Sequence, residues 1–272
     1  MPVLSAEDRD FWEENGYVTI HDAVPPENVK AAEQAVWDFL EMEPDDPESW
    51  YPDPPRRGIM VEIYQHQALW NNRQYPRLHQ AFAEIRGTEK LRVSFDRASM
   101  SPPNRPPIWE RTNLGLHWDM SIDLPIRFHV QGVLYLTDTA ANQGAFTCVP
   151  GFHNKIEDWI KGLPEGEDPK QQDLASLGTV AVPGKAGDLV IWHSALPHSA
   201  GINTADRPRV VQYITMSPAG EYSDEARSRR VNAWKNRMAG FGGERAEKEH
   251  ETGTTAELTP LGRRLLGLED WD

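Results

Sequence analysis

The sequence predicts a mainly β protein that carries helices at its N-terminus and is built as an antiparallel jelly roll. From residue 90 onward, short apolar or alternating runs are separated by turn residues, which is typical of strands in sandwiches and barrels. The 20 glycines and 22 prolines exceed the usual share and indicate many turns. The ten tryptophans offset a modest aliphatic content, because each buries a large apolar surface.

The chain is expected to begin with a short helix and a strand. Ser5 is a suitable N-cap for a helix over residues 6–15, and Asp8 completes a capping box with it. Gly16 is expected to end this helix, since glycine adopts the left-handed conformation of a C-cap without strain. A strand over residues 17–24 should follow.

Two further helices are expected in the N-terminal third. Residues 25–42 carry apolar side chains at helical spacing, after prolines that a first turn tolerates. The Pro-rich residues 43–57 are expected to form a surface loop, and residues 74–87 again place apolar side chains on one helical face. Residues 1–89 are therefore predicted to be a helical part packed on the barrel.

The predicted barrel core covers residues 90–218, with a helix over residues 153–163 between its strands. The expected strands are residues 91–99, 113–122, 128–138, 144–150, 178–182, 187–193 and 209–216. We expect residues 219–272 to form a loop-rich tail in which 240–257 is a loop or a mobile excursion. The tail is expected to dock through Leu261, Leu265, Leu266 and Trp271. We expect residues 1–272 to form a single domain.

Composition excludes several classes of protein. The 28 Lys and Arg against 42 Asp and Glu give a formal net charge of −14, which argues against nucleic acid and anionic membranes as partners. Cys148 is the single cysteine, so a disulfide framework and thiolate metal sites are excluded. Without a signal-like start or a long apolar run, the chain is expected to be soluble and cytoplasmic.

Common nucleotide and hydrolase motifs are absent, which leaves His117-Trp118-Asp119 as the candidate for chemistry. On a strand, His117 and Asp119 would point to the same face and share a metal ion. A facial triad for non-haem Fe(II) needs a second histidine and open positions. His193 and His198 both qualify, and spacing alone does not separate them.

Candidate ligand-binding residues lie on the neighbouring predicted strands. Arg209 lies among apolar residues facing inward, where it needs an anionic partner, and its planar fork suits the carboxylate of a dicarboxylate cosubstrate. On residues 128–138, one face alternates through His129, Gln131 and Tyr135. We expect Tyr135 and Gln131 to contact the cosubstrate, and His129 to line the substrate pocket.

Several motifs together resemble the phytanoyl-CoA dioxygenase family of Fe(II)/2-oxoglutarate oxygenases. The likeness runs from FWEENGYVTI to about residue 218, and its segments are HWD, GVLYLTD, NQGAFTCVPGFH and GDLVIWHSALPHSAGINTADRPRVVQY. The resemblance implies a double-stranded β-helix with His117, Asp119 and His198 as iron ligands. It also implies that Arg209 binds the far carboxylate of 2-oxoglutarate. It favours His198 over His193, since the family's ligand precedes a small-residue loop with Asn and then the Arg.

The sequence departs from the family pattern at two places. Many members have Ser two residues after the second histidine, where this chain has Ala200, so that contact is absent or comes from Ser199 or another group. Many also carry Lys before the Pro pair that here is Pro102-Pro103, and Arg97 is the candidate substitute. Asp119 is retained, so the resemblance implies a hydroxylase or other oxidase and not a halogenase.

The expected activity is hydroxylation of a small-molecule metabolite with Fe(II), 2-oxoglutarate and O₂, releasing succinate and CO₂. Arg97 and His129 are the candidate substrate contacts. The charge of −14 disfavours a polyanionic acyl-CoA and favours a neutral or cationic substrate. The alternative is a cupin-like metal-binding isomerase or ligand-binding protein without O₂ chemistry. We expect a homodimer because it is the commonest oligomeric state. Residues 43–57 or 240–257 are candidates for a lid over the active site.

Overall fold

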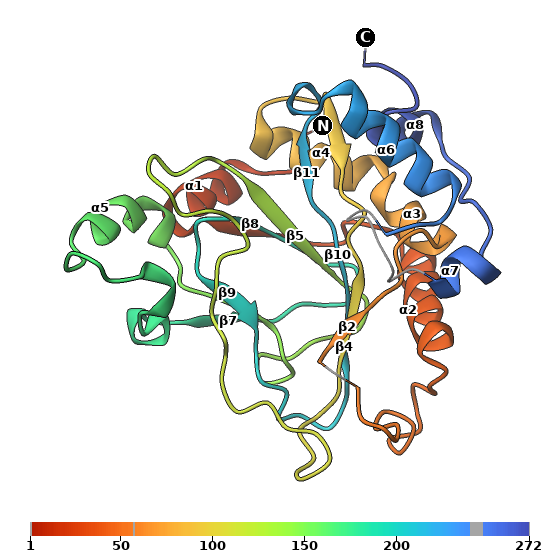
Figure 1. The fold of residues 1–272 in the computed structure, drawn as a ribbon, viewed down its shortest axis with the longest axis horizontal. Helices are drawn as coiled ribbons and strands as arrows, with labels where there is room; N and C mark the ends of the chain where they lie inside the picture. Colours follow the sequence, from red (N-terminus) through yellow and green to blue (C-terminus); the bar gives the residue numbers. More distant parts are fainter. Residues whose placement is uncertain (1, 57, 240–246, 272) are drawn as a thin grey trace.

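A larger and a smaller antiparallel sheet form the centre of the molecule (Figure 1). The structure, a computed structural model, describes residues 2–56, 58–239 and 247–271. The larger sheet has the order β1-β8-β5-β10-β4-β2, and the smaller has the order β7-β6-β9. The larger sheet comprises β1 (Tyr17–Ile20), β2 (Met60–Val61), β4 (Ala98–Ser101), β5 (Val130–Tyr135), β8 (Leu189–His193) and β10 (Arg209–Tyr213). The other strands are β6 (Phe146–Cys148), β7 (Val180–Val182), β9 (His198–Ala200) and the pair β3 (Leu91–Val93) and β11 (Met216–Pro218).

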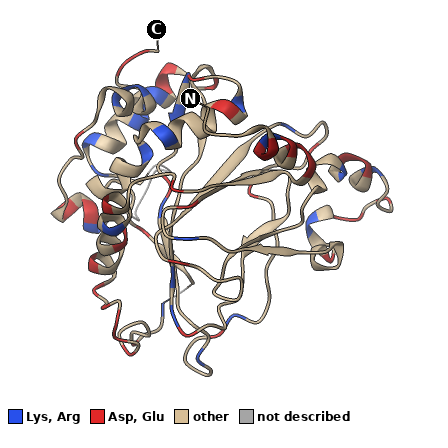
Figure 2. Cartoon of the chain, turned by 180° about the vertical axis from the view of Figure 1, so that it is seen from behind, with Lys and Arg blue, Asp and Glu red and all other residues tan. Residues whose placement is uncertain are grey.

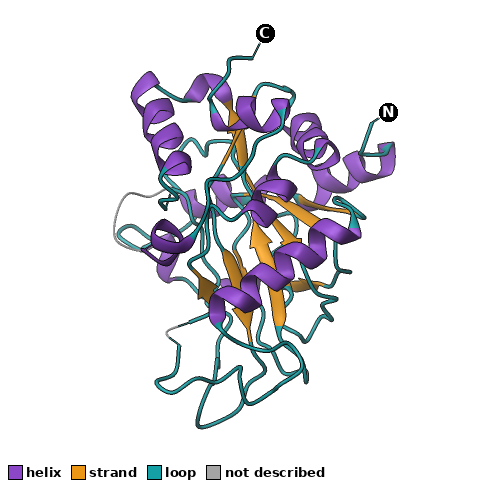
Figure 3. Ribbon diagram, turned by 90° about the vertical axis from the view of Figure 1, so that its right-hand side faces the viewer, coloured by secondary structure: helices purple, strands orange, loops and turns teal. Residues whose placement is uncertain are grey.

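Most of the helices cover the outer face of the larger sheet, whereas α5 (Ile156–Lys161) packs on the core between the two sheets (Figures 1 and 3). The other helices are α1 (Ala6–Asn15), α2 (Pro26–Leu40), α3 (Gln67–Arg73), α4 (Pro76–Arg86), α6 (Asp224–Lys235), α7 (Glu247–Thr252) and α8 (Pro260–Leu266), with short 3₁₀ turns at Phe152–Asn154, Pro169–Gln171, Leu174–Leu177 and Ala219–Glu221. A Cβ at Gly132 of β5 would lie 2.8 Å from the Phe82 ring of α4 and 2.7 Å from the Ile214 carbonyl oxygen. The absence of a side chain there lets α4 pack closely on the sheet.

The inner faces of the two sheets share a second apolar core. Val133, Val190 and Val211 of the larger sheet pack in one cluster with Phe146 and Cys148 of the smaller. The prediction of a mostly sheet core with N-terminal helices is confirmed, and the arrangement is that of a jelly-roll-like fold.

Local signals predicted the first elements well. Ser5 and Asp8 form the expected capping box, since the Asp8 N–H donates to Ser5 Oγ and the Ser5 N–H donates to Asp8 Oδ2. Gly16 ends α1 in the left-handed conformation, at φ 75°. These interactions depend only on neighbouring residues, which is why the sequence reveals them.

Three of the predicted strands are different in the structure. Residues 113–122 form no strand and pair with the smaller sheet through an isolated bridge between His117 and His198. Residues 91–99 divide into β3 and β4, and residues 209–216 divide into β10 and β11. In both cases one half of the predicted strand belongs to the larger sheet and the other half to the separate β3–β11 pair. The alternation of side chains does not reveal such a change of pairing partner.

The C-terminal tail is held more firmly than expected. The Glu249 carboxylate of α7 is buried and accepts hydrogen bonds from the N–H groups of Tyr64 (2.6 Å) and Gln65 (3.0 Å). Residues 247–252 thus form a packed helix and not the expected loop or mobile excursion, residues 253–257 are a loop as expected, and residues 240–246 lie outside the described part. Leu265 and Leu266 are fully buried, which confirms the predicted docking of the tail.

Charged residues gather on the peripheral helices and loops, and the sheets are largely free of them (Figure 2). Among the described residues, no helix combines the length and apolar character needed to span a bilayer.

Replacement of Leu265 tests the docking of α8. Leu265→Ala should lower the free energy of unfolding by about 2–5 kcal/mol, because it leaves a cavity in a fully buried site. Leu124→Ala is the matched control, since Leu124 is 40% exposed and its truncation should change stability by less than about 0.5 kcal/mol. Urea unfolding of both variants measures the difference, and equal small effects would contradict the docked tail.

Candidate metal centre and binding cavity

Reciprocal main-chain hydrogen bonds bring two distant histidines together. The His117 N–H donates to the His198 carbonyl at 3.1 Å, and the His198 N–H donates to the His117 carbonyl at 3.0 Å. The two ring centroids are 5.0 Å apart. Ligand atoms of His117, Asp119 and His198 all lie within 4.8 Å of one another, so the predicted triad is one spatial cluster.

Each imidazole of the cluster is oriented by a carbonyl of its own segment. His117 Nδ1 donates to the Gly115 carbonyl at 2.8 Å, and His198 Nδ1 donates to the Leu196 carbonyl at 2.9 Å. A carbonyl can only accept, so these contacts place the proton on Nδ1 and leave Nε2 as the ligand atom. Both Nε2 atoms point toward Asp119, at 3.5 Å from His117 and 3.2 Å from His198.

The Asp119 carboxylate has three polar neighbours: the Gln131 amide, which donates to it, and the Nε2 atoms of His117 and His198, which donate to it only in the protonated imidazolium form. His117, and after it His198, hold the pKa of the Asp119 carboxyl far below its ordinary value, and Gln131 acts in the same direction. The Gln131 Nε2 donates to Asp119 Oδ2 at 2.7 Å. The hydrogen bond with Asp119 in turn raises the pKa of His117. Asp119 is therefore ionised at neutral pH and ready to act as an anionic ligand.

The donor set fits a divalent transition metal. Two imidazoles and one carboxylate on one side of an ion form the facial arrangement of non-haem Fe(II) enzymes, with positions left for other ligands. His117 and Asp119 are half-exposed, whereas His198 is buried beside the Trp192 ring, 5.0 Å away. Trp118 points away from the cluster, and its Nε1 donates to the Ala195 carbonyl.

Arg209 lies in the wall of the same cavity and lacks an acidic partner. It is only 1% exposed, and its Nη1 donates to Ser99 Oγ at 3.2 Å. Its guanidinium carbon lies 5.9 Å from the centre of the Tyr135 ring, and its Nε has no hydrogen-bond partner. No carboxylate in the described part of the chain pairs with Arg209. A buried guanidinium in this state calls for an anion from outside the chain.

An open cavity of about 970 Å³ joins the histidine cluster to Arg209. This volume lies near the upper end for small-molecule sites and exceeds the size of a five-carbon acid. Arg97, His129 and Gln131 line this cavity, and the substrate and cosubstrate contacts expected of them stay predictions. Asp96 and Arg111 also line the cavity and were not predicted, because both lie in irregular segments without strand alternation.

Tyr135 and Gln131 have contacts other than those predicted. The Tyr135 hydroxyl is fully buried, donates to the Val182 carbonyl at 2.6 Å and accepts from the Phe146 N–H. Burial raises the pKa of Tyr135 to about 12. Tyr135 thus lies behind Arg209 and supports it through its ring, while the amide of Gln131 is bound to Asp119.

His193 lies outside the histidine cluster. It ends β8, its Nδ1 accepts from the Ala195 N–H, and its ring lies 5.2 Å from both Phe128 and His153. Burial lowers the pKa of His193 to about 4, and neighbouring cationic groups add to this. The histidine that spacing could not separate from His198 is therefore a neutral packing residue.

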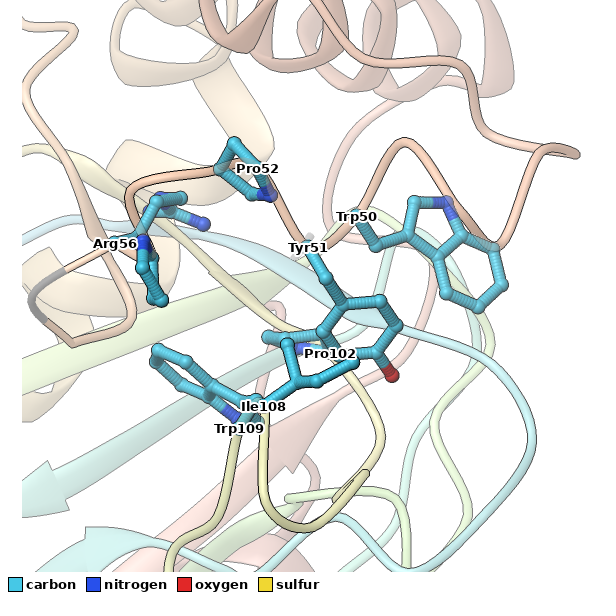
Figure 4. Close-up of a pocket in the computed structure, with 8 residues that line it drawn as sticks. Trp50, Tyr51, Pro52, Arg56, Pro102, Ile108 and Trp109 are labelled. Atoms are coloured by element: carbon cyan, nitrogen blue, oxygen red, sulfur yellow. The ribbon is translucent and has the colours of Figure 1, made fainter.

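The rim of the cavity is braced by the Pro-rich stretch. Trp50 and Tyr51 line a small pocket with Pro102, Ile108 and Trp109 of the segment after β4, and Figure 4 shows Tyr51 between Trp50 and Trp109. The Tyr51 hydroxyl donates to the Pro103 carbonyl at 2.8 Å, and Trp109 also lines the large cavity. A lid role for residues 43–57 stays a prediction, and position 57 lies outside the described residues.

Ser199 and Ala200 occupy the position where the sequence departs from the expected pattern. The Ser199 hydroxyl donates to the Leu114 carbonyl and so serves a main-chain contact. The Ala200 carbonyl instead accepts from Arg111 at 3.3 Å. A cationic side chain thus lies beside Ala200.

Comparison with known proteins agrees with the sequence resemblance. The family profile described as phytanoyl-CoA dioxygenase matches residues 12–211. A Dictyostelium discoideum protein named "Putative phytanoyl-CoA dioxygenase" is 21% identical over 279 residues, covering 84% of this chain and 79% of its own. Among solved structures, the non-heme alpha ketoglutarate dependent carbocyclase SnoK from nogalamycin biosynthesis is 24% identical with a TM-score of 0.54, covering 79% of this chain and 85% of its own. The epimerase SnoN from the same biosynthesis is 19% identical with a TM-score of 0.56, covering 78% and 80%.

The low pKa of His193 predicts a pH dependence of stability. The unfolded chain carries an ordinary histidine with a pKa near 6.5, so it binds a proton at pH values where folded His193 does not. The stability that the folded protein gains from keeping His193 neutral is fully present above about pH 6.5 and is lost as the pH falls toward 4. His193→Asn keeps an acceptor for the Ala195 N–H and should reduce the loss between pH 7 and 5 by about 1–2 kcal/mol. Urea unfolding at both pH values measures it, and an unchanged loss would count against a neutral, buried His193.

The hydrogen bond from Gln131 predicts an effect on metal affinity. Gln131→Leu removes the donor to Asp119 and should weaken Mn(II) binding by about 10- to 100-fold, as loss of a group that orients a ligand usually does. Gln34→Leu is a matched control, since Gln34 makes the same kind of bond to Asp38 on the surface of α2. Anaerobic calorimetry with Mn(II) compares the two, and equal affinities would refute the role of Gln131.

Proposed function

The chain belongs to the phytanoyl-CoA dioxygenase family, and from this premise we propose that it is an Fe(II)- and 2-oxoglutarate-dependent dioxygenase that hydroxylates a small-molecule metabolite. The observation that carries the proposal is a single cavity with a His/Asp/His cluster and a buried guanidinium without an acidic partner. A keto acid with a second carboxylate satisfies both features at once. Closure of the two sheets into a double-stranded β-helix is part of the same proposal.

His117, Asp119 and His198 would hold the iron through two neutral Nε2 atoms and one carboxylate oxygen. Bound there, Fe(II) would supply the activation of O₂ that couples conversion of 2-oxoglutarate to succinate and CO₂ with oxidation of the substrate. The contribution of the chain is orientation: the carbonyls of Gly115 and Leu196 fix the two imidazoles, and Gln131 fixes the carboxylate. Orientation of this kind lowers the cost of assembling the reactants.

Arg209 would bind the far carboxylate of 2-oxoglutarate. Its fork can form two parallel hydrogen bonds with a carboxylate, which are stronger than its bond to Ser99. Tyr135 and Ser99 hold the guanidinium in place, so little freedom is lost on binding. The buried position also keeps water from competing for the same donors.

Arg97 and His129 are our candidates for substrate contacts. Both line the cavity, and no side chain in the described ranges lies within hydrogen-bonding or ion-pair distance of the Arg97 guanidinium. Hydroxylation is the simplest outcome that the retained Asp119 supports. The net charge of −14 supports a neutral or cationic small molecule as substrate and argues against nucleic acid.

Loss of either ligand histidine should abolish turnover. We expect His117→Ala and His198→Ala to reduce Fe(II)-dependent conversion of 2-oxoglutarate to succinate by at least about 100-fold, because two ligands hold the metal poorly. His193→Asn is the matched control, a histidine outside the cluster, and should retain activity. Succinate release is the measurement, and full activity in both alanine variants would refute the assignment.

A further inference from the structure

Arg111 is a second cation in the wall of the large cavity. It lies in the irregular segment that leads to His117, and its guanidinium donates to the carbonyls of Gly201 and Ala200, at 3.3 Å each. These contacts are long and use two of its five N–H donors. No other hydrogen bond or ion pair of this guanidinium is formed within the described chain.

Arg111 and Arg209 are neighbours. A Cβ built on Gly144, at φ 73°, would lie 3.4 Å from the Gly201 carbonyl oxygen that Arg111 binds and 3.5 Å from Arg209 Cδ. Gly144 therefore lies next to both the Gly201 carbonyl that Arg111 binds and the aliphatic part of the Arg209 side chain. Burial, and next the charge of Arg209, lower the pKa of Arg111.

Repulsion between the two neighbouring guanidinium groups raises the free energy of the protein when no anion is bound. Neither has a carboxylate within ion-pair distance among residues 2–56, 58–239 and 247–271. Ser99, which accepts from Arg209, and Tyr213, which lies near Arg111, carry neutral hydroxyls that bond to each other at 3.3 Å. Like charges at reduced dielectric repel unless an anion lies between them.

We infer that Arg111 and Arg209 grip the same carboxylate, the far one of 2-oxoglutarate, and that Arg111 sets the preference for dicarboxylic over monocarboxylic keto acids. The inference rests on the proposed function and adds a specificity residue to it. A purely structural role, tying Gly201 to the segment before His117, would need a donor for a neutral carbonyl but no cation beside a buried Arg209.

The test compares two keto acids that differ only in the far carboxylate. Anaerobic calorimetry on the Mn(II)-loaded protein measures binding of 2-oxoglutarate and of 2-oxopentanoate. Arg111→Gln removes the charge while its amide can still donate to the Gly201 carbonyl, and Arg111→Lys keeps the charge without the fork. Arg127→Gln is the matched control, because Arg127 is exposed and outside the cavity wall.

We expect Arg111→Gln to weaken 2-oxoglutarate binding by about 10-fold or more, as loss of a charge-assisted hydrogen bond does. Binding of 2-oxopentanoate should change by less than about two-fold. Arg111→Lys should fall between wild type and Arg111→Gln, and Arg127→Gln should match wild type. Thermal melting of each variant reports whether it is folded.

Two results would overturn the inference: unchanged binding of 2-oxoglutarate in Arg111→Gln, or equal weakening for both keto acids. The first would leave Arg111 as a main-chain tether, and the second would assign it to the keto acid end or to the metal. A wild-type protein that binds Mn(II) but not 2-oxoglutarate would instead refute the proposed function itself, so the two failures are distinguishable.

Discussion

The site depends on one main-chain contact, the pair of hydrogen bonds between His117 and His198. The segment that carries His117 and Asp119 forms no strand, and this bridge is its main-chain pairing with β9, which the side-chain bonds of Ser199, Arg111 and Trp118 reinforce. The bridge also sets the two histidines opposite each other, with their rings 5.0 Å apart. A metal centre made from two remote parts of the chain thus rests on backbone pairing, which is insensitive to side-chain chemistry.

The buried, unpaired charge of Arg209 in the cavity wall lowers the stability of the ligand-free fold. Burying Arg209 without a carboxylate, next to a second guanidinium, is unfavourable in the absence of a ligand. Two side chains hold Arg209 in place despite the penalty for removing its charge from water: Tyr135 and Ser99. Tyr135 is itself fixed by hydrogen bonds with Val182 and Phe146. Binding of a matching anion repays this cost, so ligand affinity and stability of the fold are linked.

Much of the candidate site was predictable from local pattern. The spacing of His117 and Asp119 and the inward-facing Arg209 are visible in the sequence, and both features lie in one cavity. Tyr135 was predicted to contact the cosubstrate because alternation places it on the inner face of the sheet. In the structure it is fully buried at the end of β5, with its ring packed against the Arg209 guanidinium. Arg111 gave no signal, since it lies in an irregular segment where no periodicity applies.

The sequence by itself determined the capped first helix, the sheet-rich core, the exclusion of thiolate metal sites and the residue types of the cluster, because these depend on composition and on near neighbours. The tertiary structure decided what depends on register and burial. It separated His198 from His193, gave Gln131 to Asp119, placed Arg111 beside Arg209 and divided two predicted strands between different pairings. Each of these outcomes requires knowing which distant backbone lies alongside, and no local pattern encodes that.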